Sequence, residues 1–190
     1  MEPDYTWTVD VENDFGGRTN GIKGIAEGLP RILEIFRANN VKALFFISSE
    51  LAISNSGRIQ DILDKGHEIG SHGHFHIRYK DHWRAQEDRE ISERLLSLFS
   101  QKKLKYRAPR FYYQSEDSIY SYRNNHVSLL KYTWFGGGVP QNPIFYIHPF
   151  DIVRGKRAPN LFSQILYSKP ELVYETFTKL VDEFPGRRRL

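Results

Sequence analysis

The feature that most constrains the fold of this chain is a regular alternation of short apolar runs with amphipathic segments. Residues 5–11 (YTWTVDV) and 41–48 (VKALFFIS) are rich in β-branched and aromatic side chains, which is typical of buried strands, and residues 67–73 (HEIGSHG) predict a third strand. Between them, residues 28–40 (GLPRILEIFRANN) and 56–66 (SGRIQDILDKG) place apolar side chains on one helical face. Consecutive parallel strands need helical crossovers, so this order predicts an α/β protein with a parallel sheet or barrel.

The second half of the chain continues the alternation less regularly. Residues 83–103 and 169–184 predict two amphipathic helices, and residues 104–113 (LKYRAPRFYY) and 144–153 (IFYIHPFDIV) predict two further strands. Residues 114–143 contain three consecutive glycines and two prolines, so we expect irregular strands and loops there.

Length and composition limit the classes of protein to which the chain can belong. The 190 residues suffice for one domain with a sizeable core, so we expect a single domain over residues 1–190. The formal charge of +4 is not arranged as a basic stripe within a nucleic-acid motif, which disfavours nucleic acid as a partner. The longest apolar run, ALFFI, is too short to cross a bilayer, and the first residues lack the pattern of a secretory signal. We therefore expect a cytoplasmic protein without an integral membrane segment.

Polar side chains follow several of the predicted strands. The chain has no cysteine, so any metal ion must be held by nitrogen and oxygen ligands. Chemistry in α/β sheets and barrels collects at the C-terminal ends of the strands, where the loops converge. A carboxylate and two imidazoles would bind a divalent cation and leave one coordination position open for water. The side chains at these positions are Asp10, Glu12 and Asp14, the histidines of residues 72–76, Arg107 and His148.

Each of these groups also has an ordinary structural interpretation. Histidines four residues apart in a loop are often exposed or structural, and Asp10 could cap a helix. Arg107 could form a surface ion pair, and His148 could be a hydrogen-bonded histidine of the core. His74 should point away from His72 and His76 if the segment is extended, because side chains alternate along a strand.

Four segments occur in an order that resembles the motifs of a known family. Together they resemble the polysaccharide deacetylases, which are also described as carbohydrate esterase family 4 or the NodB-homology domain. The resemblance spans residues 5–153 and implies a deformed (β/α) barrel that removes N-acetyl groups from amino sugars. The segments are TVDVEND, EIGSHGHFH, YRAPRFY and FYIHPF, with VKALFFIS between the first two.

The resemblance implies roles for residues of the first two motifs. Asp10 corresponds to the general base, and His72 and His76 match the metal ligands of the His-x-x-x-His motif. The usual first motif has two adjacent aspartates, whereas here one residue separates Asp10 from Glu12. This spacing makes Glu12 the expected carboxylate ligand, with Asp14 as the alternative. We expect the divalent metal ion to be zinc, with cobalt, nickel or manganese as alternatives.

The remaining motifs imply the groups that would complete the reaction. Arg107 matches the arginine that orients the base, and His148 matches the histidine that acts as general acid. Asp117 is a weak match for the aspartate that orients this histidine. In the reaction so implied, Asp10 deprotonates a metal-bound water, and protonated His148 releases the amine. A backbone N–H near Phe111 could help to stabilise the oxyanion.

Aromatic side chains near these motifs are candidates for sugar binding. Phe111, Tyr112 and Trp134 offer flat apolar faces that suit the CH surfaces of sugars, although core packing is an equal alternative. We expect a metal-dependent N-deacetylase whose partner is an N-acetylated glycan or glycan precursor. Two other functions remain as alternatives. One is a metal-dependent amidase acting on a small non-sugar amide, and the other is an inactive carbohydrate-binding or regulatory domain on the same scaffold.

Overall fold

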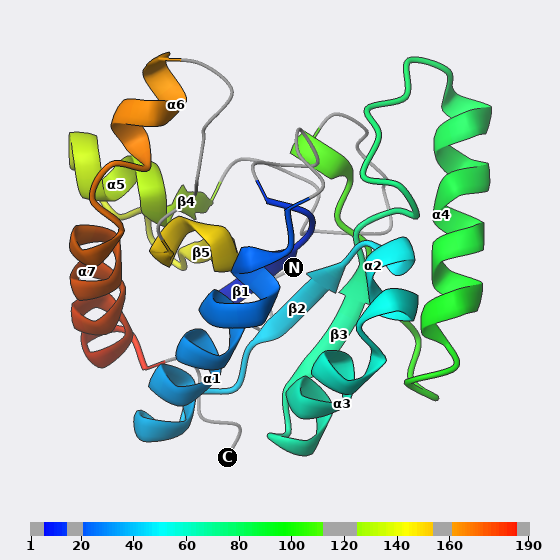
Figure 1. The fold of residues 1–190 in the computed structure, drawn as a ribbon, viewed down its shortest axis with the longest axis horizontal. Helices are drawn as coiled ribbons and strands as arrows, with labels where there is room; N and C mark the ends of the chain where they lie inside the picture. The colour runs from blue at the N-terminus through cyan, green and yellow to red at the C-terminus, as the bar shows by residue number, and fades with distance from the viewer. Residues whose placement is uncertain (1–5, 15–20, 112–124, 154–160, 186–190) are drawn as a thin grey trace.

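The structure, a computed structural model, describes residues 6–14, 21–111, 125–153 and 161–185. Its centre is a sheet of five parallel strands in the order β3-β2-β1-β5-β4 (Figure 1). The predicted α/β class with a parallel sheet is confirmed. The strands are β1 (Trp7–Val11), β2 (Leu44–Ile47), β3 (Glu68–Ser71), β4 (His126–Ser128) and β5 (Ile144–Ile147).

Helices connect the strands and cover the sheet. Figure 1 shows α4 beside β3, and α5 and α7 beside the opposite side of the sheet. The α-helices are α1 (Leu29–Ala38), α2 (Ser49–Ser54), α3 (Ser56–Asp64), α4 (His82–Leu96), α5 (Leu129–Phe135), α6 (Leu161–Leu166) and α7 (Pro170–Glu183). Shorter helical turns are the π-helical η1 (Gly24–Gly28) and the 3-10 turns η2 (Pro109–Phe111) and η4 (Pro149–Ile152). Among the described helices, none is both long enough and apolar enough to cross a membrane.

A cluster of aromatic side chains joins β1 to the first and last α-helices. Trp7 of β1 is fully buried and stacks on Phe145 of β5 with ring centroids 4.6 Å apart. The Trp7 ring also packs edge-to-face with Phe177 of α7. The ring centroid of Phe36 from α1 lies 5.4 Å from that of the same Phe177. Burial of such a side chain stabilises the fold by about 1.5–3 kcal/mol. These aromatic contacts tie the two ends of the described chain to the central strand.

In residues 104–111, the described part of the strand predicted over residues 104–113, the prediction is wrong except at one position. Tyr106 forms a single parallel bridge with Ser71 at the outer edge of β3. Pro109 then begins the turn η2, and the next two residues have φ angles of 55° and 54°. Proline has no N–H to donate, and a positive φ does not fit a strand, so the backbone leaves the sheet.

The other differences also concern short elements. Within the described part of residues 114–143, the chain forms the regular elements β4 and α5, and residues 136–143 form a loop, as expected. Ser128 caps α5, because its side chain accepts a hydrogen bond from the backbone N–H of Lys131. The predicted strand over residues 144–153 ends at Ile147, where η4 follows. The short helices α2 and α6 were not predicted.

The described strands form an open row, and side chains bring its two ends together. The ring of Phe111, which follows the Tyr106 bridge, lies 4.9 Å from the ring of His126 in β4 and 5.5 Å from Tyr146 in β5. Residues at the C-terminal ends of β1, β3 and β5 line one shared cavity.

Candidate active site

Two buried carboxylates lie at the C-terminal end of β1. Side chains alternate along a strand, so Asp10 and Glu12 lie on one face while Val11 packs into the apolar core on the other. Asp10 is 2% exposed and Glu12 is 3% exposed. The single residue between them thus places both carboxylates in the same cavity.

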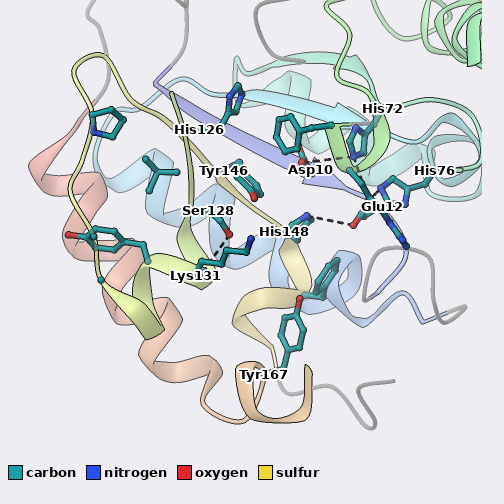
Figure 2. A pocket seen from close by; sticks show the side chains of 18 of the residues that line it. Asp10, Glu12, His72, His76, His126, Ser128, Lys131, Tyr146, His148 and Tyr167 are labelled. Atoms are coloured by element: carbon teal, nitrogen blue, oxygen red, sulfur yellow. Dashed lines mark hydrogen bonds and ion pairs between the residues drawn. The ribbon is translucent and has the colours of Figure 1, made fainter. Parts of the chain in front are cut away.

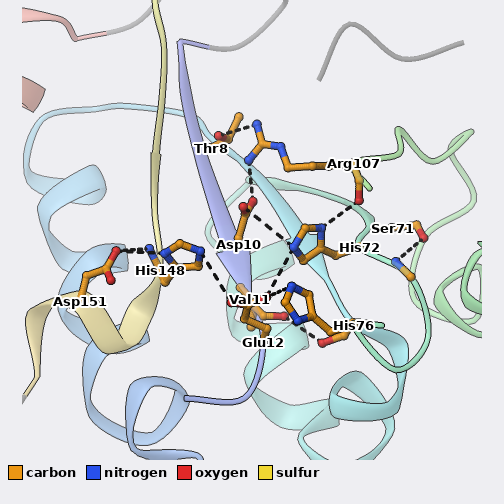
Figure 3. A network of polar contacts seen from close by, with 12 residues as sticks. Thr8, Asp10, Val11, Glu12, Ser71, His72, His76, Arg107, His148 and Asp151 are labelled. Atoms are coloured by element: carbon orange, nitrogen blue, oxygen red, sulfur yellow. Dashed lines mark hydrogen bonds and ion pairs between the residues drawn. The ribbon is translucent and has the colours of Figure 1, made fainter. Parts of the chain in front are cut away.

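Two histidines reach these carboxylates from the loop after β3. Nδ1 of His72 donates a hydrogen bond to the Arg107 carbonyl at 2.8 Å, which leaves Nε2 facing Glu12 Oε2 at 3.5 Å. His76 has a φ of 55°, so the loop folds back and its ring lies 4.9 Å from that of His72. Nε2 of His76 contacts the same Oε2 of Glu12. Figure 3 shows both rings pointing at Glu12.

The three side chains fit a divalent cation. One ligand atom from each of Glu12, His72 and His76 lies within 4.8 Å of the others. Burial raises the pKa of Glu12, but the charge of His76 and the contacts with both rings outweigh burial and hold it below its ordinary value. No group in the described part of the chain donates a well-aligned hydrogen bond to Glu12 Oε2. A buried, ionised oxygen that faces two imidazole nitrogens is a suitable donor set for zinc and similar ions.

The alternative carboxylate, Asp14, has a different position. Its two oxygens accept hydrogen bonds from the backbone N–H groups of Lys23 at 3.0 Å and Gly24 at 2.8 Å. Asp14 therefore holds the start of η1 against the end of β1. It is not part of the cluster that Glu12 forms with the histidines.

A buried arginine holds Asp10. Nη1 of Arg107 donates to Asp10 Oδ1 at 2.5 Å, and Nη2 donates to Thr8 Oγ1 at 3.0 Å. The fully buried guanidinium also lies 4.3 Å from the ring centroid of Phe46. Burial raises the pKa of Asp10, but the charges of Arg107, His72 and His148 outweigh burial and lower it. Asp10 is therefore ionised, and its Oδ2 faces Nε2 of His72 at 3.9 Å.

His148 approaches the β1 carboxylates from the side opposite His72 (Figure 3). Its Nε2 lies 3.6 Å from Glu12 Oε1, while its Nδ1 and backbone N–H both donate to Asp151 Oδ2, at 3.1 and 2.8 Å. Burial lowers the pKa of His148, but the charges of Asp151, Glu12 and Asp10 raise it to about 10. The ring is therefore protonated at neutral pH in this arrangement.

The sequence did not lead us to Asp151, the residue that holds His148 in the structure. Asp117, the predicted partner, lies outside the described residues. The available signal was the segment HPFD, in which Asp151 follows His148 by three residues. The 3-10 turn η4 brings these two positions together.

These groups line one end of a cavity of about 730 Å³ (Figure 2). Asp10, Glu12, His72, His76 and His148 all contribute to its wall. The remaining wall contains aromatic rings that could face a sugar: Phe111, Tyr132, Tyr146, Phe150 and Tyr167.

The predicted aromatic residues have different positions. Phe111 lines the cavity, but its backbone N–H donates to the Ala108 carbonyl at 2.9 Å and so is not aimed at an oxyanion. Trp134 packs against the core and donates from Nε1 to the Leu166 carbonyl at 2.8 Å, so the structure does not bring it to the cavity. Tyr112 lies outside the described residues.

A carboxylate that the sequence did not indicate secures the histidine loop. Asp88 of α4 is buried and accepts hydrogen bonds from the backbone N–H groups of His74 at 2.7 Å and Phe75 at 3.4 Å. The side chain of His74 turns away from the cluster, as expected, and its Nδ1 lies 2.7 Å from Ser49 Oγ. Helices α2 and α4 therefore fix the segment between the two metal-ligand candidates.

Sequence comparison identifies relatives with known activities. Residues 20–128 match a family model described as polysaccharide deacetylase. A stretch of 47 residues is 38% identical to the peptidoglycan-N-acetylglucosamine deacetylase PgdA of Listeria monocytogenes. This stretch covers 25% of the present chain and 10% of the Listeria protein, so the chain matches a small part of that relative.

Solved structures share the fold over most of the chain. The peptidoglycan deacetylase PdaC of Bacillus subtilis has a TM-score of 0.60 at 14% identity, covering 94% of this chain and 83% of PdaC. A carbohydrate esterase family 4 pseudoenzyme of Bacillus anthracis has a TM-score of 0.57 at 16% identity, covering 94% of this chain and 61% of its own. At such identities the likeness concerns the fold, and it agrees with the expected deformed (β/α) barrel.

Proposed function

Because this chain belongs to the polysaccharide deacetylase family, as its four motifs predicted, we propose that it is a metal-dependent hydrolase of N-acetylated amino sugars. The substrate would be a polysaccharide or a glycan precursor. One observation carries the proposal. The cluster of Glu12, His72 and His76 shares a cavity with one member of each of two pairs of opposite charge, the buried pair of Asp10 with Arg107 and the partly buried pair of His148 with Asp151.

The residues of the cavity divide the reaction between them. A divalent cation held by Glu12, His72 and His76, with zinc as the first choice and cobalt, nickel or manganese as alternatives, would polarise the amide carbonyl and acidify a water molecule. Asp10 accepts the proton of the attacking water at Oδ2, the oxygen that faces His72. The salt bridge from Arg107 to Oδ1 keeps this carboxylate ionised and correctly turned.

The leaving amine requires an acid on the other side of the amide. An amine anion is too basic to be expelled, so the C–N bond breaks only as the nitrogen takes up a proton. Nε2 of His148 faces the cavity while Nδ1 is held by Asp151, and this arrangement directs the ring proton at the substrate. Water oxygen ends on the acetyl carbon and the proton on nitrogen, giving acetate and a free amino sugar.

The test is acetate release by metal-loaded protein from neutral chito-oligosaccharides and from small acylated amides. We expect turnover of the sugars, and Asp10→Asn should lower kcat by about 10²- to 10⁴-fold, because it removes the base but keeps an oxygen for Arg107. The variant should bind as much metal as the wild type. Asp182→Asn, an exposed position on α7, serves as the matched control.

Other outcomes would assign another function. Turnover of small amides alone would identify an amidase. The Bacillus anthracis relative is described as a pseudoenzyme, so an inactive binding domain is the other outcome to be tested. Sugar binding without acetate release from any substrate would support that alternative and contradict the proposal, as would full activity of Asp10→Asn.

A further inference from the structure

The cavity has a second chemical feature away from the metal-ligand cluster. Its wall opposite β1 is formed by the start of α5 and by the loop that follows this helix. Lys131 lies in the first turn of α5, where the Ser128 cap fixes its backbone N–H. Figure 2 shows its side chain extending from α5 toward His148. An exposed ammonium group is thereby directed to the part of the cavity where the amide nitrogen would leave.

The charges of the cavity wall are unequally matched. Asp10 and Glu12 are the only carboxylates among the described lining residues, and Arg107 and the histidines already neutralise them. Lys131 forms no ion pair with a carboxylate in the part of the chain that the structure describes. A ligand that fills the cavity would therefore meet positive charge beside the reacting amide.

The wall beside Lys131 also leaves room for a substituent. Gly136, Gly137 and Gly138 line the cavity, and a Cβ atom built at any of the three would meet nothing within 4 Å. The loop after α5 therefore puts no side chain into the cavity at these three positions. A group carried on the sugar ring can reach the ammonium without a steric clash from these three positions.

We propose that Lys131 forms a subsite for an anionic substituent, a carboxylate or a phosphate, carried by the N-acetylated sugar. The inference rests on the proposed function and specifies its substrate class: the enzyme prefers acidic amino sugars to neutral ones. Lysine is a compact point charge with three donors, so either anion can be accommodated, and a neutral sugar would gain little from it.

The experiment compares wild type with Lys131→Gln on three substrates. These are N,N′-diacetylchitobiose, N-acetylmuramic acid with its carboxylate, and N-acetylglucosamine 1-phosphate. We expect kcat/KM for at least one acidic sugar to fall by about tenfold, since a charge-assisted hydrogen bond is lost, while the neutral sugar changes by less than about twofold. Which acidic sugar is affected identifies the anion. Lys131→Arg should retain most of the preference.

Controls separate a subsite from a general effect of charge or folding. Lys179→Gln removes one positive charge from an exposed position on α7 and should leave all three substrates unaffected. An equal loss on neutral and acidic sugars with Lys131→Gln would overturn the proposal, and so would an unchanged profile.

A binding measurement distinguishes failure of this inference from failure of the proposed function. If no sugar releases acetate, the hydrolase proposal fails, yet titration of N-acetylglucosamine 1-phosphate and N-acetylmuramic acid into metal-loaded protein still tests the subsite. Binding of one of these sugars that is about tenfold weaker in Lys131→Gln supports it, and this difference should shrink at high salt. Equal affinities of both proteins, or no binding by either, would overturn it.

Discussion

The pair formed by His148 and Asp151 has catalytic value because the two groups are fixed relative to each other. Asp151 is buried and takes hydrogen bonds from both the ring and the backbone of His148. The carboxylate therefore sets the orientation of the ring, selects Nε2 as the nitrogen that faces the cavity, and favours the protonated form.

Replacing Asp151 tests this role. Asp151→Asn should lower kcat on N-acetyl sugars by about 10- to 100-fold and change KM little. This loss is part of the rate enhancement that general acid–base catalysis provides. Steady-state kinetics at neutral pH measure both constants, and Asp182→Asn provides the comparison. A loss confined to KM would mean that Asp151 supports substrate binding and not proton delivery.

His67 provides a prediction about pH that is independent of catalysis. It lies between Phe36 and Phe45, and its Nδ1 accepts a hydrogen bond from the Ala43 N–H. Burial, with the charges of Lys42 and Lys65, lowers the pKa of His67 to about 4. The unfolded chain therefore takes up this proton as the pH falls below about 6.5, whereas the folded chain resists it until about 4.

The resulting loss of stability is measurable. Between pH 7 and 4 the free energy of unfolding of the wild type should fall by up to about 3 kcal/mol from this group alone. His67→Gln should show a correspondingly shallower slope. Urea denaturation at a series of pH values provides the comparison, and parallel curves for the two proteins would contradict the assignment.

Residue patterns in the sequence revealed most of the site, and their limits have a physical cause. Asp10 and Glu12 were grouped because both follow the first predicted strand, and alternation along β1 puts them on one face. Asp151 was missed because a strand over residues 144–153 would put it on the face opposite His148. Only the 3-10 turn makes them neighbours, and the sequence signal for so short a turn is weak.

At the level of elements, α4 determines the shape of the histidine loop. Asp88 holds the backbone between His72 and His76, and Gly73, with a φ of 78°, packs so tightly that its Cβ would lie 2.5 Å from this carboxylate. The hydroxyl groups of Ser71 and Ser92 join β3 to the same helix at 2.9 Å. The helix thereby fixes the distance between the two ligand-bearing residues.

Loosening this connection should weaken metal binding. Asp88→Asn should lower the affinity for zinc by about 10- to 100-fold, because supporting groups of this kind orient the ligands. Calorimetric titration of the metal-free protein with zinc measures the effect. Glu87→Gln, exposed on the same helix, should bind zinc as the wild type does. Unchanged affinity in Asp88→Asn would show that the loop holds its shape without α4.

Long periodic elements were predicted well and short ones poorly. The helices α1, α3 and α7 and the strands β1, β2 and β3 follow clear patterns of apolar residues, since each buries a whole face. The segment after α4 depends instead on a single bridge and two residues with positive φ, which no periodicity predicts. Tertiary contacts decide such segments.

For the whole molecule, the site depends on parts of the chain that are distant in sequence. The family match covers residues 20–128, yet Asp10 and His148 lie outside it and complete the same cavity. The central position of β1, paired with β2 on one side and β5 on the other, brings these parts together. The cluster thus exists only in the folded chain.

A metal ion that binds only the folded chain should therefore stabilise it. Zinc at about 100 times its dissociation constant should contribute about 2.7 kcal/mol and raise Tm by about 5–10 °C. Removal of the metal by a chelator should reverse the shift. His72→Ala should show no shift, and an equal shift in this variant would locate the bound zinc elsewhere. Thermal unfolding followed by circular dichroism measures each case.

The contact of Phe111 with His126 and Tyr146 has a consequence for how such a chain diversifies. Backbone ladders resist change, because altering them shifts the register of whole strands. Here, the ring of Phe111 meets the rings of His126 and Tyr146, and each of the three can be exchanged singly. All three line the cavity, so a smaller or larger ring would widen or narrow it while the sheet kept its pairing. Descendants of one scaffold could in this way accept ligands of different width.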